Sequence, residues 1–138
     1  MTVSNEVREQ ISDQIARLQT YFPDRVLASA CPSRVVLDHV TSKWGVLVLV
    51  SLADRTLRWG ELRRSVEGVS EKMLAQTLQV LERDGLVHRR ALPVIPPHVE
   101  YSLTDLGVDL VGHLLPLMGW LAANAPAIVE NAATAPAR

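Results

Sequence analysis

Four polar side chains recur at intervals of three and four residues in the middle of the chain: Lys72, Gln76, Gln79 and Arg83. At about 100° per residue they share one face of a helix, while Glu71 and Glu82 fall on its flank. Amides and cations without a carboxylate suit DNA base edges and phosphate oxygens. A solvated polar face that binds nothing would show the same pattern.

The residue types on this face predict distinct contacts with DNA. Gln76 suits adenine and Lys72 suits guanine, so these two are the predicted base readers. Ser70 and Arg83 are better placed to hold phosphates. Met73 lies at the edge of the face, where it can touch a thymine methyl, although packing in the core is the simpler expectation.

A helix from Ser70 to Arg83 must position these side chains. Leu74, Leu78 and Leu81 recur at i, i+4 and i+7 and form its apolar stripe. Ser70 can cap its first turn and Gly85 can end it in the left-handed conformation.

The segment before this helix predicts a helix-turn-helix. Residues 57–59 form a short extended piece, residues 60–66 a brief helix, and Gly68 allows a tight turn into Ser70. Two short helices joined by such a turn form a helix-turn-helix, with the polar-faced helix as its second member.

After Gly85 the apolar period changes to two over residues 87–91 and 98–103, which predicts a β-hairpin with its loop at residues 92–97. A hairpin after a helix-turn-helix is the wing of a winged helix. Arg89 and Arg90 must point to opposite faces of it, so only one can follow a DNA groove, and the sequence does not say which. Five arginines are candidates for phosphate contacts, and any one of them can instead serve solubility alone: Arg58, Arg63, Arg64, Arg89 and Arg90.

Three further helices are expected around this unit. Residues 3–22 predict an amphipathic helix that ends at Pro23. Its apolar stripe must dock on the body of the protein or on a second chain. Ser33 is expected to cap the next helix. Thr41-Ser42 interrupts this helix, and it resumes from Trp44 to Ala53. The run Val46–Val50 resembles a strand locally, but its flanks favour a helix.

The last helix is expected to be capped by Thr104 and kinked by Pro116. Its apolar surface is broader than one packing face needs, so a dimer would bury the second side. Residues 131–138, rich in Ala and Pro, suggest a frayed tail. The expected divisions are therefore an N-terminal extension at 1–30, a DNA-binding domain with its dimerisation helix at 31–123, and a flexible tail at 124–138.

Composition limits the function further. The chain has 138 residues, of which 48% are apolar, and a net charge of −1. Residues 55–90 hold eight basic and five acidic residues, so this segment is at +3. The positive charge therefore lies where the polar-faced helix lies.

Several classes of protein are not expected. One cysteine excludes an internal disulfide and a cysteine-based zinc finger, and the four histidines are scattered, so no metal or cofactor is expected. No nucleophile or phosphate-loop motif points to an enzyme. No secretory signal is recognisable, and no uncharged apolar stretch is expected to reach the roughly 20 residues that span a bilayer. A cytoplasmic protein without a membrane partner is expected.

The chain resembles the HxlR-type winged-helix transcriptional regulators of bacteria and archaea from Cys31 to about Trp120. Six motifs in order carry the resemblance: Cys31-Pro32, Lys43-Trp44, residues 61–64, residues 69–74, residues 81–87 and residues 96–104. The resemblance agrees with the expected fold, which is mainly α with a small β-hairpin (α+β). The expected N- and C-terminal dimerisation helices complete it, although the helix at residues 3–22 lies outside the resemblance. The resemblance implies a homodimer that binds operator DNA near promoters. Two recognition helices in successive major grooves, about 34 Å apart, would require a near-palindromic operator. His98 stands near the wing where the family often has Arg.

Several branches of that family sense electrophiles, quinones or oxidants at the position that matches Cys31. Here Cys31 precedes an expected helix N-terminus, whose dipole would lower the pKa of the thiol, and Arg34 would add to the effect. A response would require an intersubunit disulfide, a mixed disulfide or alkylation. A small buried cysteine without reactivity is the alternative.

The sequence thus predicts a sequence-specific, homodimeric DNA-binding regulator, with repression favoured over activation. Two other functions stay open. One is a winged helix that binds an acidic protein partner. The other is a regulator induced by a small-molecule ligand at the dimer interface rather than by thiol chemistry.

Overall fold

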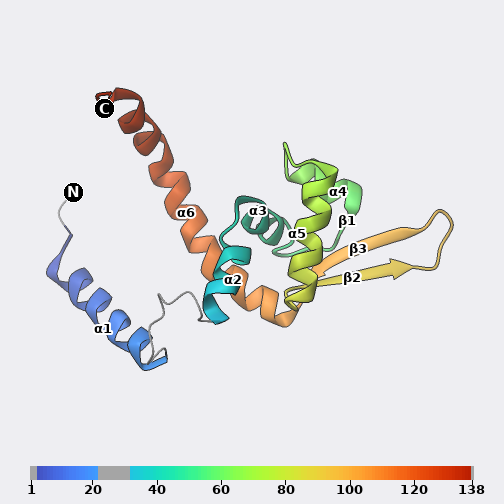
Figure 1. The fold of residues 1–138 in the computed structure, drawn as a ribbon, viewed down its shortest axis with the longest axis horizontal. Helices are drawn as coiled ribbons and strands as arrows, with labels where there is room; N and C mark the ends of the chain where they lie inside the picture. The colour runs from blue at the N-terminus through green and yellow to red at the C-terminus, as the bar shows by residue number, and fades with distance from the viewer. Residues whose placement is uncertain (1–2, 22–31, 138) are drawn as a thin grey trace. The chain divides into compact units, whose positions relative to one another are not determined.

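The computed structural model describes residues 3–21 and 32–137. It divides into two units, Met1–Val40 and Thr41–Arg138, each described by itself below. The first contains α1 (Asn5–Tyr21) and α2 (Pro32–Val40). The second, seen in Figure 1, contains α3 (Lys43–Ser51), β1 (Leu57–Arg58), α4 (Trp59–Ser65), α5 (Glu71–Arg83), β2 (Val87–Leu92), β3 (His98–Leu103) and α6 (Asp105–Thr134).

Both helices of the first unit expose apolar side chains. The stripe that predicts α1 is 43–50% exposed at Val7, Ile11, Ile15 and Leu18, and α2 has no buried residue. The expectation that Ser33 caps α2 is wrong, because α2 already begins one residue earlier, at Pro32. Proline suits a first helical position, where a backbone N–H would have no partner in the helix. Pro23, the expected end of α1, lies outside the described residues.

In the second unit α3 confirms a helix for the apolar run Val46–Val50. Ser42 caps it by accepting from Gly45 N at 3.1 Å, so the break at Thr41-Ser42 is also the start of a new helix. Val48 and Leu49 are fully buried. A strand would not place these two neighbours on one packed side, whereas a helix packed against both α5 and α6 buries them together.

The helix-turn-helix follows as expected. The brief first helix, α4, buries Leu62 completely, and the turn after it contains Gly68 at φ 88°. That left-handed angle favours glycine. The three leucines of α5 are at most 2% exposed and form the centre of the core: Leu74, Leu78 and Leu81.

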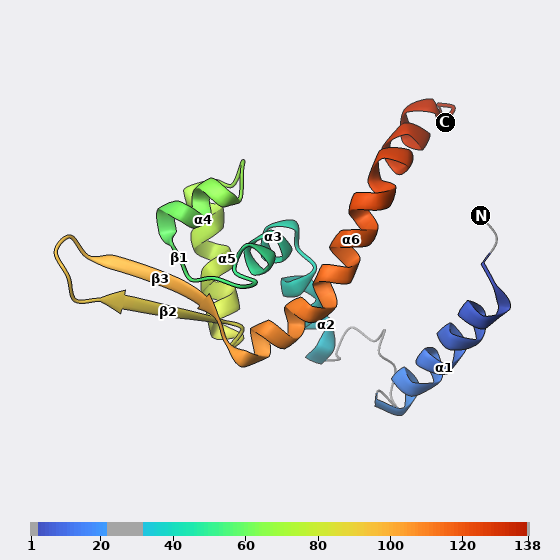
Figure 2. The same ribbon diagram turned by 180° about the vertical axis from the view of Figure 1, so that it is seen from behind.

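The wing is a three-stranded antiparallel sheet in the order β1-β3-β2. Residues 57–58, expected only as an extended piece, pair with β3 and add an edge strand to the hairpin. Two rows of cross-strand partners result. One row joins Leu57, Tyr101 and Arg89, and the other joins Arg58, Glu100 and Arg90. Figures 1 and 2 show the hairpin extending away from the helices of this unit.

A close backbone junction links the end of α5 to the start of α6. Thr104 caps α6 by accepting from Gly107 N at 3.0 Å, and its hydroxyl donates to Gly85 O at 2.6 Å. Thr104 N donates to Leu86 O at 3.1 Å. A Cβ built on Gly107 would lie 2.1 Å from Leu86 O, so only glycine permits this approach.

The last helix is longer than expected. It continues past the expected tail boundary at residue 123 as far as Thr134, and it contains Pro126 as well as Pro116. Figures 1 and 2 show that α6 changes direction after its first turns. Only Gly107, Val111 and Leu114 of α6 are buried, while Trp120 and Val129 are more than half exposed.

The length of α6 also corrects an expectation about membranes. Residues 110–129 hold no Asp, Glu, Lys or Arg, so an uncharged, largely apolar stretch does reach about 20 residues. By length and composition α6 is able to cross a bilayer, with a mean hydropathy of 1.5 over its most apolar window. Its first turns are nevertheless built into this unit, because they pack against α3 and β3.

We expect Gly107→Ala to lower the free energy of unfolding by about 3 kcal/mol, since the new methyl must displace the Leu86 carbonyl. Gly119→Ala is the matched control on the same helix, because its Cβ would meet nothing within 4 Å. Alanine's higher helix propensity should leave that variant unchanged or up to about 1 kcal/mol more stable. Urea denaturation followed by circular dichroism measures both, and equal effects would contradict the tight junction.

Candidate nucleic-acid interface

The polar face of α5 is presented to solvent as the sequence predicts. Ser70 Oγ accepts from Met73 N at 3.1 Å and so fixes the first turn. With the three leucines buried beneath, the opposite face exposes all four polar side chains: Lys72, Gln76, Gln79 and Arg83. Met73 is 39% exposed, so it lies at the surface rather than in the core.

A groove runs along α5, between this helix and the wing. It is lined by Trp59, Lys72, Ala75, Gln76, Leu78, Gln79, Glu82, Arg89 and Tyr101. Three of the four predicted polar residues therefore meet one wing arginine in a single depression, and two aromatic rings form part of its walls. The sequence pattern does not reveal Trp59 and Tyr101 as groove residues, because the pairing of β1 with β3 brings them there.

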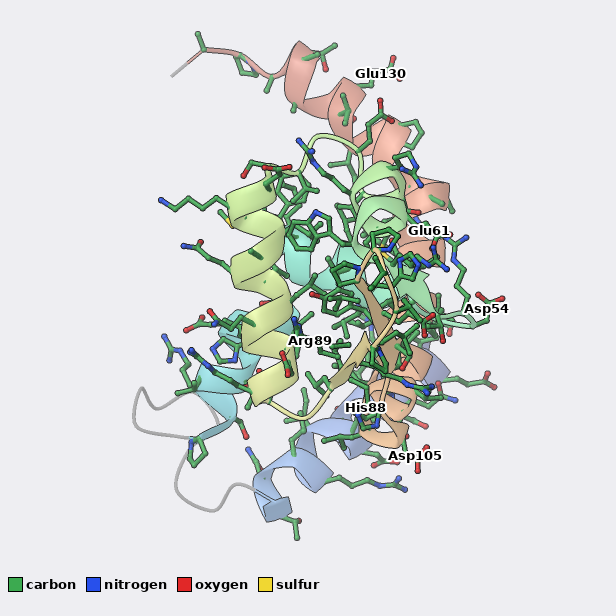
Figure 3. All side chains as sticks on the ribbon, turned by 90° about the vertical axis from the view of Figure 1, so that its right-hand side faces the viewer. Asp54, Glu61, His88, Arg89, Asp105 and Glu130 are labelled. Carbon is green, nitrogen blue, oxygen red and sulfur yellow. The ribbon has the colours of Figure 1, made fainter. Side chains whose placement is uncertain are left out.

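The structure decides between the two adjacent wing arginines. Arg89 is the cross-strand partner of the buried Tyr101, and partners on adjacent strands share a face of the sheet. Figure 3 shows Arg89 on the side of the wing nearer α5, with His88 on the other side. Arg90 is the partner of Glu100 on that other face. Arg89 is thus the wing arginine that faces the groove.

A second hollow lies between the start of α4 and the end of the wing loop. Arg58, Arg64 and His98 line it together with Trp59 and Pro97. The only carboxylate among its lining residues is Glu61, whose Oε1 accepts from Arg58 N at 3.0 Å. The structure therefore brings two of the predicted phosphate-contact residues, Arg58 and Arg64, to one place beside His98, and this hollow shares only Trp59 with the groove along α5.

Arg63 is placed differently from the other arginines. Its Nη1 lies 2.9 Å from Glu71 Oε1, and the two side chains are 48% and 67% exposed. This ion pair ties α4 to the first turn of α5. Glu71 also offsets part of the attraction that Arg63 would offer to a phosphate.

One acidic residue departs from the expectation. The polar face of α5 was expected to be free of carboxylates, with Glu82 on the flank, yet Glu82 lines the groove beside Gln79 and Arg89. The flank of α5 is the side that faces the wing, so a flank residue belongs to the groove once the sheet is in place. Helical periodicity alone does not locate the wing.

Cys31, the predicted thiol sensor, lies outside the described residues. So does the expected boundary between residues 30 and 31. Arg34, expected to act on the thiol, is exposed on α2.

The features of the second unit agree with a family model. The model described as HxlR-like helix-turn-helix matches residues 39–128. The chain belongs to this family. The family consists of transcriptional regulators with a winged helix, and the expected mainly α fold with a small β-sheet is confirmed.

Individual relatives agree. The HTH-type transcriptional regulator YtfH of Escherichia coli is 51% identical over 116 residues, which cover 84% of this chain and 92% of the relative. A solved structure of the putative regulator ytfH from Salmonella typhimurium is 53% identical with a TM-score of 0.73, covering 78% of this chain and 96% of that one.

Two other solved structures carry redox conditions in their descriptions. The redox regulator HypR in its oxidized form is 36% identical with a TM-score of 0.64, over 68% of this chain and 97% of that one. Diamide-treated YodB from Bacillus subtilis is 29% identical with a TM-score of 0.58, over 70% and 96% respectively.

Arg89 and Arg90 lie on opposite faces of the wing, so their substitutions should affect duplex binding differently. Arg89→Ala should raise the Kd for duplex DNA about tenfold and reduce the slope of log K against log salt by about 1. Arg90→Ala should change the Kd less than about threefold, because Arg90 lies opposite the groove beside Glu100. Fluorescence anisotropy at several salt concentrations measures both. A larger effect of Arg90→Ala would contradict the assignment of the faces.

Proposed function

We propose that this chain represses transcription as a homodimer that reads operator DNA with α5. The observation that carries the proposal is the groove beside α5, where exposed amides and cations meet a wing arginine. Donors in a depression between a helix and a wing fit a phosphate backbone that passes beside a helix in the major groove. The protein acts in the cytoplasm, as a regulator without enzymatic activity.

Within α5, Gln76 and Lys72 read bases and Gln79 assists from the groove side. Gln76 pairs with adenine and Lys72 with guanine. The exposed Met73 touches a thymine methyl. Ser70 and Arg83, at the two ends of the helix, hold phosphates. Ser70 can do so while it caps α5, because its hydroxyl accepts from Met73 N and keeps its proton for a phosphate oxygen.

The remaining cationic residues position the backbone. Arg89 contacts a phosphate from the groove, and the cluster of Arg58, Arg64 and His98 contacts a second one near the wing loop. Arg63 contributes less than a free arginine, because Glu71 accepts from it. Arg90, opposite the groove, contributes least of the five arginines.

A second copy of this chain covers the exposed apolar surface of α6, where Leu117, Trp120 and Ile128 are about half exposed. The apolar stripe of α1 takes part in dimerisation or docks on its own chain. A homodimer places two copies of α5 in successive major grooves, about 34 Å apart, and therefore requires a near-palindromic operator. Binding there blocks the promoter sterically.

Cys31 serves as the sensor for electrophiles or oxidants. Support comes from the similarity to HypR, whose description names it a redox regulator, and to YodB, solved after diamide treatment. Since the chain has one cysteine, the modified state is an intersubunit disulfide, a mixed disulfide or an alkylated thiol. Such a change alters the spacing of the two α5 helices and hence the affinity for DNA.

The salt dependence of duplex binding tests the proposed function, because phosphate contacts release counterions and make the affinity fall steeply with salt. No binding, or binding that does not change with salt, would favour instead a winged helix that binds an acidic protein partner.

Two substitutions in α5 test which side chains read bases. Gln76→Ala should reduce the preference for the selected operator over random duplex by about 1–3 kcal/mol, whereas Arg83→Ala should weaken binding to both duplexes about equally.

Treatment with diamide tests the role of Cys31. We expect the treated wild-type protein to lose at least about tenfold in operator affinity, and the Cys31→Ser variant to keep its affinity. Unchanged binding of the wild type would overturn thiol sensing. A response to a small molecule that survives in Cys31→Ser would instead indicate a ligand at the dimer interface.

A further inference from the structure

Glu82 lies where DNA is proposed to bind. It lines the groove along α5 together with Lys72, Gln79 and Arg89, and it is the only acidic residue among the nine that do so. The other acid of this helix, Glu71, is held by Arg63 at 2.9 Å. No ion pair or side-chain hydrogen bond joins Glu82 to any residue of the described ranges 3–21 and 32–137, and its side chain is exposed.

A carboxylate in this position opposes the contacts that its neighbours make. A phosphate drawn toward Arg89 passes near an ionised group of the same sign, and at a few ångströms in a wet groove the repulsion is comparable to one surface ion pair. The same carboxylate can accept a hydrogen bond only from base amino groups, above all cytosine N4. Cytosine or adenine opposite the carboxylate offers such a donor and compensates the repulsion, whereas guanine or thymine at that position offers only acceptors.

We propose that Glu82 sets the specificity of this regulator by repelling DNA that places guanine or thymine, rather than cytosine or adenine, opposite it. The inference rests on the proposed function, since it assumes that the groove along α5 holds DNA. It assigns to one residue an unfavourable interaction with random duplex. Discrimination between two partners can be built from such repulsion as well as from attraction.

Glu82→Gln tests this, because glutamine keeps the size of the side chain and one acceptor oxygen, removes the charge, and replaces the second oxygen by an NH2 donor. We expect the Kd for random duplex to fall about threefold to tenfold at low salt, with the gain shrinking as salt screens the groove. The Kd for the selected operator should fall less, so the ratio of the two affinities decreases. Anisotropy titrations of both duplexes at two salt concentrations measure this.

Glu130→Gln is the matched control, since it removes the same charge from the far end of α6, away from α5 (Figure 3). It should leave both affinities unchanged, which separates the position of Glu82 from the net charge of the chain. Equal gains for both variants, no gain for Glu82→Gln, or weaker binding of Glu82→Gln to both duplexes would overturn the proposal. The last result would mean that Glu82 positions Arg89.

The wild-type titration keeps this inference separate from the proposed function. If the wild type shows no salt-dependent binding to any duplex, the proposed function itself fails. If the wild type binds and Glu82→Gln binds identically, only the role of Glu82 fails.

Discussion

The backbone contact between Leu86 and Gly107 determines how the two functional halves of the second unit are joined. The chain leaves α5 through Gly85, at φ 75°, and enters α6 through Thr104, whose side chain hydrogen-bonds both to Gly85 O and to Gly107 N. Because Leu86 O nearly touches the Cα side of Gly107, the start of α6 has little freedom relative to the end of α5. The proposed dimerisation helix and the proposed reading helix therefore move together.

This coupling bears on how a regulator of this kind can respond. A change in the packing of α6 against the proposed second copy would reach the groove through three hydrogen bonds and one close contact rather than through a flexible linker. Tightly packed junctions have discrete arrangements rather than a continuous range, so a small displacement of α6 reorients α5 as a whole. The response needs no separate element between the interface and the DNA.

The elements of the second unit follow from local signals, and the groove does not. The caps follow their chemistry: Ser70 begins α5, Gly85 ends it, and Thr104 begins α6. The leucine stripe of α5 is buried as its period requires. The groove depends instead on strand register, which pairs residues distant in sequence. Neither the place of Trp59 nor the face of Arg89 is encoded locally. The extension of α6 to Thr134 was not predicted, because prolines and asparagine near the C-terminus suggest a tail. The alanines between them favour a helix, and the helix continues.

The balance of charges over this surface favours selectivity over general affinity for DNA. Arg63 is compensated by Glu71 at 2.9 Å, Glu100 stands between Arg58 and Arg90 in one cross-strand row, and Glu82 lies inside the groove. Each acid reduces the attraction that any duplex would feel, whatever its sequence. What remains is a small number of amides and cations whose benefit depends on the base or phosphate placed opposite them. On the proposed function, counterion release at the uncompensated cations supplies the salt-dependent part of the affinity, and the correct site must supply the rest.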